Sequence, residues 1–144
     1  MTERKKRFLV AEDDDGARRM VSRVLRSETS EVLEAVDGAE ALAALHADHD
    51  FDLLVTDVDM PQMSGLELIE ALDSTGFRGA VIVMTGRLDV DRIAELEGLV
   101  ESGRVQGFLG KPFLPSQLRA AVVIALGFIA DRDRIDARRR DSDY

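Results

Sequence analysis

Five short apolar runs alternate with segments of helical periodicity, and this alternation limits the fold more than any other feature of the chain. The runs lie at 8–11, 32–35, 52–57, 80–84 and 105–109. Apolar residues recur with helical spacing between the runs and after the last one. The expected helices lie at 17–25, 39–47, about 63–72, 90–102 and from 115 onward. Strands that alternate with helices imply parallel pairing, right-handed crossovers and helices on both faces of the sheet. The sequence therefore predicts a single three-layer α/β domain.

Length and composition set the domain organisation. The 144 residues, of which 45% are hydrophobic, fit one domain with a substantial core. We expect a basic N-terminal lead at 1–6, the folded domain at 7–129 and a charged extension at 130–144. The extension should continue the last helix and then become disordered. The absence of cysteine excludes disulfides and thiolate metal sites.

Charge and hydropathy predict the cellular setting. A net charge of −9 argues against nucleic acid as a partner, because phosphate binding depends on clustered Lys and Arg. No apolar run is long enough to span a bilayer. The basic residues at 4–7 lead straight into a strand, not into the long apolar region of a signal peptide. We therefore expect a cytoplasmic protein with no membrane contact.

The central apolar run delivers two carboxylates, Asp57 and Asp59, and stops at Pro61. In open α/β sheets, ligands bind beyond the carboxyl ends of the strands, so Asp57 lies where a site is expected. Taken alone, the two carboxylates could equally be turn residues that accept hydrogen bonds from loop amides.

Polar residues also follow the other strands. Glu12 and Asp13 follow the first run, Asp57 ends the third, Thr85 follows the fourth and Lys111 follows the fifth. All five should meet at one edge of a parallel sheet. Clustered carboxylates resist ionisation unless a cation neutralises them, and Mg²⁺ takes oxygen ligands of this kind. An Asp carboxylate is also a competent nucleophile towards phosphorus, with an ammonium and a hydroxyl to stabilise the transferred charge.

At these residues the chain resembles the receiver domains of two-component response regulators. The matching segments are LVAEDD at 9–14, DVDMPQMSGLEL at 57–68, VMTG at 83–86 and KPF at 111–113. The resemblance covers residues 7–129, and four separated motifs agree in order and identity.

The resemblance implies a specific chemistry. Asp57 would be the phosphoacceptor, loaded by a sensor histidine kinase or a histidine phosphotransfer protein. Lys111 would contact the phosphoryl group. The implied Mg²⁺ ligands are Glu12, Asp13, Asp57 and the backbone carbonyl of Asp59.

The resemblance also implies a switch and a topology. Thr85 would move towards the phosphoryl group and transmit the change to Phe108, which stands where the family often has tyrosine. The implied fold is flavodoxin-like with strand order 2-1-3-4-5, and the Lys111-Pro112 bond is expected to be cis. Nothing after residue 129 is long enough to be an output domain, so we expect a stand-alone receiver for an unknown downstream target.

Two alternatives remain at this point. Asp57, Val58 and Asp59 after an apolar strand also resemble the nucleophile motif of haloacid-dehalogenase-type phosphatases, which carry it on the first strand of a longer chain. A receiver-like scaffold that binds partners without phosphorylation is the other.

Helical spacing predicts which faces of the helices are buried. The first helix should turn its arginines, Arg18 among them, largely to solvent. The fourth should bury Ile93, Leu96, Leu99 and Val100. The last helix has an inward stripe and a second apolar stripe, made of Ala120, Ile124 and Phe128, with Ile135 beyond. A helix that is apolar on two faces has more than one surface to bury. We therefore expect the fourth helix, fifth strand and fifth helix to form a target or homodimer surface, unless another segment of the monomer covers the stripe.

Overall fold

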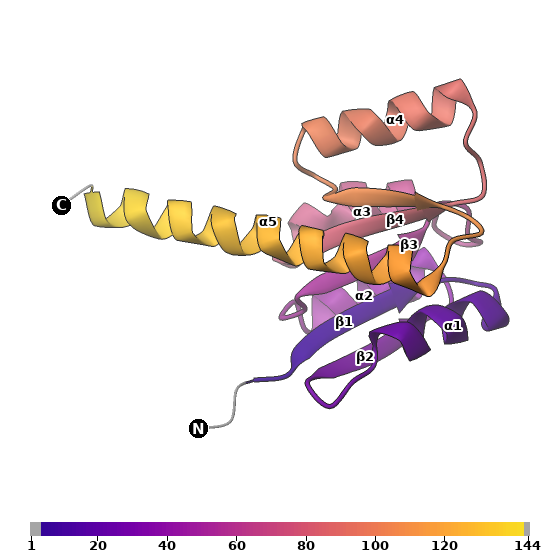
Figure 1. Cartoon of the computed structure of the whole chain (residues 1–144), viewed down its shortest axis with the longest axis horizontal. Coiled ribbons are helices and arrows are strands. Elements are labelled where there is room, and N and C mark those ends of the chain that lie inside the picture. The colour runs from indigo at the N-terminus through magenta and orange to yellow at the C-terminus, as the bar shows by residue number, and fades with distance from the viewer. Residues whose placement is uncertain (1–3, 143–144) are drawn as a thin grey trace.

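Five parallel strands form one sheet in the order β2-β1-β3-β4-β5, with helices on both faces (Figure 1). The computed structural model describes residues 4–142. The strands are β1 (Lys6–Ala11), β2 (Ser30–Ala35), β3 (Leu53–Asp57), β4 (Ala80–Thr85) and β5 (Gly107–Gly110). The helices are α1 (Asp15–Leu25), α2 (Gly38–Ala47), α3 (Gly65–Ala71), the 3-10 helix η1 (Leu72–Thr75), α4 (Val90–Glu101) and α5 (Pro115–Ser142). The predicted fold class and strand order are confirmed.

Two apolar clusters, one on each face of the sheet, form the core between the sheet and its helices. On one face, α1 and α5 pack against alternate residues of the central strands, such as Val10, Val55 and Ile82. On the other face, α2, α3 and α4 pack against the intervening residues, such as Leu9 and Leu54. Every residue of β3 and of β4 is buried, as expected for central strands of a parallel sheet that is covered on both sides.

Capping side chains fix where several helices begin. Asp14, Asp37 and Asp89 each accept a hydrogen bond from a backbone N–H in the first turn of α1, α2 and α4. Ser64 and Glu67 form a reciprocal capping box at the start of α3. Each of these caps lies in a loop that leaves the carboxyl end of a strand. The caps therefore also order the loops at that edge of the sheet.

The buried face of α4 differs from the prediction. Leu96 is buried as expected and Leu99 packs against the core, but Val100 is 38% exposed. The other buried residue of α4 is Arg92. The helix is rotated so that this arginine, four residues before Leu96, faces inward.

Arg18 of α1 also departs from its predicted solvent position. Its side chain is only 12% exposed, and its guanidinium donates a hydrogen bond to the carbonyl oxygen of Glu12 at 2.9 Å. The same guanidinium pairs with Asp15 and Glu34. These polar partners explain why an arginine can turn inward here.

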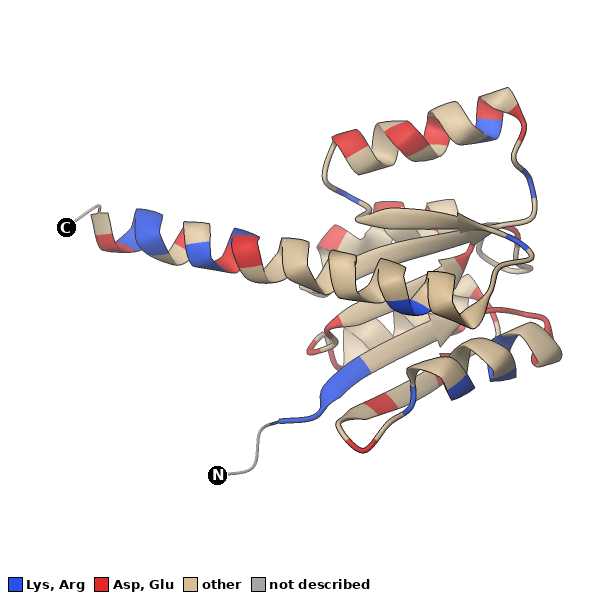
Figure 2. Cartoon of the chain, in the orientation of Figure 1, with Lys and Arg blue, Asp and Glu red and all other residues tan. Residues whose placement is uncertain are grey.

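Helix α5 is 28 residues long and runs well past the sheet (Figure 1). Its inward stripe is confirmed, with Leu118, Val122 and Ala125 buried. The C-terminal half of the helix carries many positively and negatively charged residues, whereas the N-terminal half, which packs on the sheet, is almost uncharged (Figure 2). This charged half is tied back to the loop before β4: Arg132 donates to the carbonyl of Arg78 at 2.6 Å, and Arg78 pairs with Asp136 at 3.4 Å. The predicted disordered end can only begin after Ser142, outside the described residues.

The second apolar stripe of α5 remains at the surface. Ile124 and Phe128 are each 58% exposed and Ile135 is 51% exposed. Within the described residues, no segment of the chain covers these side chains. The monomer therefore presents an exposed apolar strip, most of it on the nearly uncharged half of α5.

We expect Gly65→Ala to lower the free energy of unfolding by about 1–3 kcal/mol. A Cβ at Gly65 would collide with the carbonyl oxygen of Asp57 and come within 3.0 Å of the Cα of Val58. Both are backbone atoms that cannot give way without moving the end of β3. As a control, Gly98→Ala in α4 places its Cβ where nothing lies within 4 Å, and should stabilise by about 0.5–1 kcal/mol. Urea unfolding followed by circular dichroism measures both, and effects of the same sign would contradict this account.

Candidate functional site

Three carboxylates converge where β1 and β3 end. Glu12 and Asp13 follow β1, and Asp57 is the last residue of β3. The two strands are adjacent, with Ala11 paired to Thr56, so their next residues are neighbours across the sheet. One carboxylate oxygen from each residue lies within 4.8 Å of the others. Glu12 and Asp57 are buried, while Asp13 is exposed and forms the open side of the cluster.

Lys111 neutralises part of this charge. Its ammonium pairs with the Glu12 carboxylate and lies 3.1 Å from Oδ1 of Asp57. The backbone N–H of Lys111 donates to the carbonyl of Thr85 at 2.7 Å, which fixes the loop after β5 beside β4. Burial lowers the pKa of Lys111, but its hydrogen bonds to Glu12 and Asp57 outweigh this and raise it, so the side chain remains an ammonium. The Lys111-Pro112 bond is cis, as predicted.

Burial disfavours the charged form of the Glu12 carboxylate. Its pKa is raised from 4.5 to about 7, mainly by burial and also by the nearby charge of Asp57, while Lys111 acts in the opposite direction. Its Oε2 atom is buried and has no hydrogen-bond partner among the described residues. A buried acceptor without a partner is costly, and a bound cation would satisfy it.

The donor set fits a hard divalent cation. All of the clustered side-chain donors are carboxylate oxygens, which Mg²⁺ prefers, and exposed Asp13 leaves room for the waters that Mg²⁺ retains. The unpartnered Oε2 of Glu12 supplies a further oxygen. The residues present therefore match the acidic triad typical of magnesium sites.

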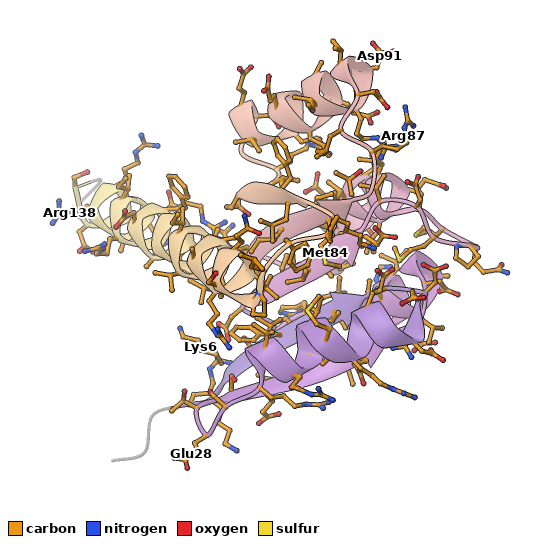
Figure 3. The ribbon with its side chains drawn as sticks, turned by 45° about the vertical axis from the view of Figure 1, so that its right-hand side comes forward. Lys6, Glu28, Met84, Arg87, Asp91 and Arg138 are labelled. Atoms are coloured by element: carbon orange, nitrogen blue, oxygen red, sulfur yellow. The ribbon has the colours of Figure 1, made fainter. Side chains whose placement is uncertain are left out.

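Thr85 and Phe108 lie on the neighbouring strands. The Thr85 hydroxyl accepts a hydrogen bond from the N–H of Arg87 at 3.0 Å and donates to its carbonyl at 3.1 Å. It is thus held by the loop between β4 and α4, where Arg87 is labelled in Figure 3. Phe108 is half-buried on β5, opposite Val83, and packs against the core.

Asp59 follows Asp57 by two residues and turns its side chain to solvent, with 64% exposed. Its Oδ1 lies 3.6 Å from Nη2 of Arg92 on α4. Arg92 and Arg18 were not among the predicted site residues. For Arg92 the sequence held a usable signal, since a residue four positions before the buried Leu96 shares its helix face.

Known proteins of one family are similar to this chain in sequence and fold. The model of the response regulator receiver domain matches residues 8–123. FixJ, a transcriptional regulatory protein of Azorhizobium caulinodans, is 37% identical over 132 residues, or 92% of this chain and 60% of FixJ. The chemotaxis protein CheY1 of Helicobacter pylori is 33% identical over 123 residues, or 84% of this chain and 97% of CheY1. The solved structure of chemotaxis protein CheY4 of Vibrio cholerae has a TM-score of 0.71 at 29% identity, covering 84% of this chain and 98% of that one.

The chain belongs to the response regulator receiver domain family. It is therefore a phosphoacceptor domain of two-component signalling and not a catalytic enzyme. Because it spans 60% of FixJ, the activities of such longer relatives do not transfer to it directly.

The raised pKa of Glu12 should make the metal-free protein less stable as pH rises from 4.5 to about 7. In this window the folded state keeps a proton that the unfolded chain has lost, so each pH unit costs up to about 1.4 kcal/mol. Glu12→Gln cannot titrate and should show a flatter profile. Urea unfolding in EDTA across this range, for both proteins, measures the difference. Parallel profiles would show that Glu12 ionises normally in the folded state.

Proposed function

We propose that this chain is a stand-alone receiver that is switched by Mg²⁺-dependent phosphorylation of Asp57. The observation that carries the proposal is the position of the Asp57 carboxylate, which is buried beside two other carboxylates and 3.1 Å from the Lys111 ammonium. Action without an attached output domain is supported by the match over 97% of CheY1. We place the protein in the cytoplasm, where receiver domains are typically found. In the described residues, no helix has the length and apolar character needed to cross a membrane.

Asp57 supplies the nucleophile. Its carboxylate oxygen attacks the phosphorus of a phosphohistidine on a histidine kinase or histidine phosphotransfer protein. The new O–P bond forms as the P–N bond breaks, and the electron pair leaves with the imidazole, which takes a proton. Mg²⁺, held by Glu12, Asp13, Asp57 and the Asp59 carbonyl, would neutralise charge on the acyl phosphate. A contact of Lys111 with the transferred phosphoryl group is supported by its ammonium, which lies 3.1 Å from Oδ1 of Asp57.

The switch starts at Thr85. Its hydroxyl is engaged by the backbone of Arg87, and a phosphoryl group on Asp57 offers a stronger, charged acceptor. Once the hydroxyl turns to that acceptor, the β4–α4 loop loses both contacts and Phe108 on β5 repacks. Phe108 has no hydroxyl, so its part in the switch depends on packing alone.

The surface that responds to phosphorylation and binds the partner comprises α4, β5 and α5. Its apolar centre is the exposed stripe of Ala120, Ile124 and Phe128, which Ile135 extends along the same helix. Exposed aromatic and aliphatic side chains that form a contiguous patch often mark a binding surface. The downstream target, or a second copy of the chain, would bind here.

Asp57→Asn should abolish phosphorylation. Wild-type protein incubated with a small phosphodonor and Mg²⁺ should gain one phosphoryl group by intact-mass spectrometry, and EDTA should prevent the gain. The Asn variant should gain none, because an amide is too poor a nucleophile to form the acyl phosphate. Asp52→Asn, which alters a carboxylate before β3, serves as the control and should be labelled normally. Equal labelling of the Asp57 variant would refute the assignment.

The stripe of α5 should make self-association depend on phosphorylation. In sedimentation velocity, we expect the phosphorylated wild type to dimerise, and Ile124→Glu and Phe128→Glu to remain monomeric because a buried unpaired carboxylate is costly. Val123→Glu is a matched control, since Val123 is 73% exposed on the same helix but lies off the stripe. A wild type that stays monomeric in both states at high concentration would rule out homodimerisation through this stripe.

A further inference from the structure

Arg92 is the only buried basic residue among those that the structure describes. It lies in the first turn of α4, and 8% of its side chain is exposed. Arginine is almost never buried to this extent unless it is paired, because removing a charge from water is costly. The role of this guanidinium therefore depends on its partners.

The pairing of Arg92 is loose. Nη2 lies 3.6 Å from Oδ1 of Asp59, and Nε lies 3.7 Å from Oε1 of Glu95. Both contacts exceed the 2.7–3.2 Å or so of a normal N–H···O hydrogen bond. Nη1 is buried with no hydrogen-bond partner within the described residues. The guanidinium thus faces opposite charges, but its donors are not satisfied.

Stability does not explain a buried arginine in this state. Buried ion pairs can often be replaced by apolar residues of similar volume without loss of stability. Leu96, one turn later, shows that an apolar side chain suits this helix face. Unfavourable local arrangements of this kind tend to occur at switch regions, where the surrounding structure has more than one state.

The location of Arg92 gives it a specific task. Asp59 belongs to the loop after β3, two residues beyond Asp57. The loop before α4 holds the Thr85 hydroxyl through Arg87, and Figure 3 shows Arg87 close to Asp91 at the start of this helix. Leu96 is the other buried residue of α4. One of the two buried residues of α4 therefore faces a loop that flanks the acidic site.

We infer that Arg92 is a positioning residue of the phosphorylation site, whose guanidinium holds Asp59 and so couples the loop after β3 to the position of α4. The inference rests on the proposed function for the identity of the metal ligands, since the Asp59 carbonyl is one of them. Coupling between two sites is reciprocal. Mg²⁺ at the acidic site therefore steadies α4, and displacement of α4 weakens Mg²⁺ binding by the same factor.

Two measurements on the full chain, both without a phosphodonor, test this inference. Calorimetry gives the dissociation constant for Mg²⁺, which suits a chain that has no Trp. Hydrogen exchange gives the opening of α4 with and without Mg²⁺. In the wild type, Mg²⁺ should slow exchange across α4 by on the order of fivefold, near the lower end of typical couplings.

Variants then assign the coupling to one contact. Arg92→Met keeps a long apolar side chain but removes the guanidinium, and should bind Mg²⁺ without the response of α4. Asp59→Asn keeps the backbone carbonyl and should lose the response as well. The double variant should show no further loss, because both changes remove the same interaction. Arg92→Lys keeps the charge and should restore part of the response.

Controls separate this coupling from a general effect of charge. Arg104→Met removes one positive charge from the loop after α4, where the guanidinium pairs with exposed Asp73, and should leave the response of α4 intact. If Arg92→Met does not fold, Asp59→Asn decides the question, because this side chain is 64% exposed.

Three results would overturn the inference. One is a response of wild-type size in Arg92→Met or Asp59→Asn. Another is a wild type that binds Mg²⁺ and accepts phosphate on Asp57 while α4 does not respond, in which case the proposed function stands and the inference alone fails. A wild type that binds no Mg²⁺ would refute both the inference and the proposed metal site.

Discussion

Carboxylates that are buried next to one another repel, and the functional edge of this protein depends on how that repulsion is offset. Direct pairing of β1 with β3 brings Glu12 beside Asp57. Lys111, which arrives from the far side of the sheet after β5, is the cation that contacts both. Burial, with the charge of Asp57 adding to it, keeps the pKa of Glu12 raised despite the ammonium, and one oxygen of Glu12 has no partner among the described residues. The site is therefore built to attract further positive charge, and a metal ion meets that need.

The helices are not equally attached to the sheet, and the weakest attachment lies beside the switch residues. α1 and α5 each bury three residues, whereas α4 buries Leu96 and Arg92. The neighbouring strand β5 is only half-buried along its length. Regions with few buried apolar contacts open at lower free energy than the core. A change at Thr85 thus reaches a part of the domain that can move without unfolding the rest.

The sequence predicted the elements and the site for reasons that are local. Continuous apolar runs such as 80–84 identify buried strands, and strand ends place Glu12, Asp57 and Lys111 at one edge. Strand order did not follow from the runs, because alternation of strands and helices is compatible with several orders; only the resemblance to receivers supplied it. Arg92 was missed because a charged residue is expected to face solvent, although its spacing from Leu96 places it on the buried face of the helix. Its tertiary contact with Asp59 could not be read from the sequence.

The length of α5 gives the domain a lever. Ile129 is the last residue of the helix that packs against the core, and at 1.5 Å per residue the helix continues for about 20 Å beyond it to Ser142. The pivot is the contact of Arg132 and Asp136 with Arg78, on the loop before β4. A tilt of a few degrees in the half of the helix that packs on the core moves the arginines at 138–140 farther than it moves residues close to the core. A molecule bound at the end of α5 would thus be displaced by small rearrangements of the sheet that it does not itself contact.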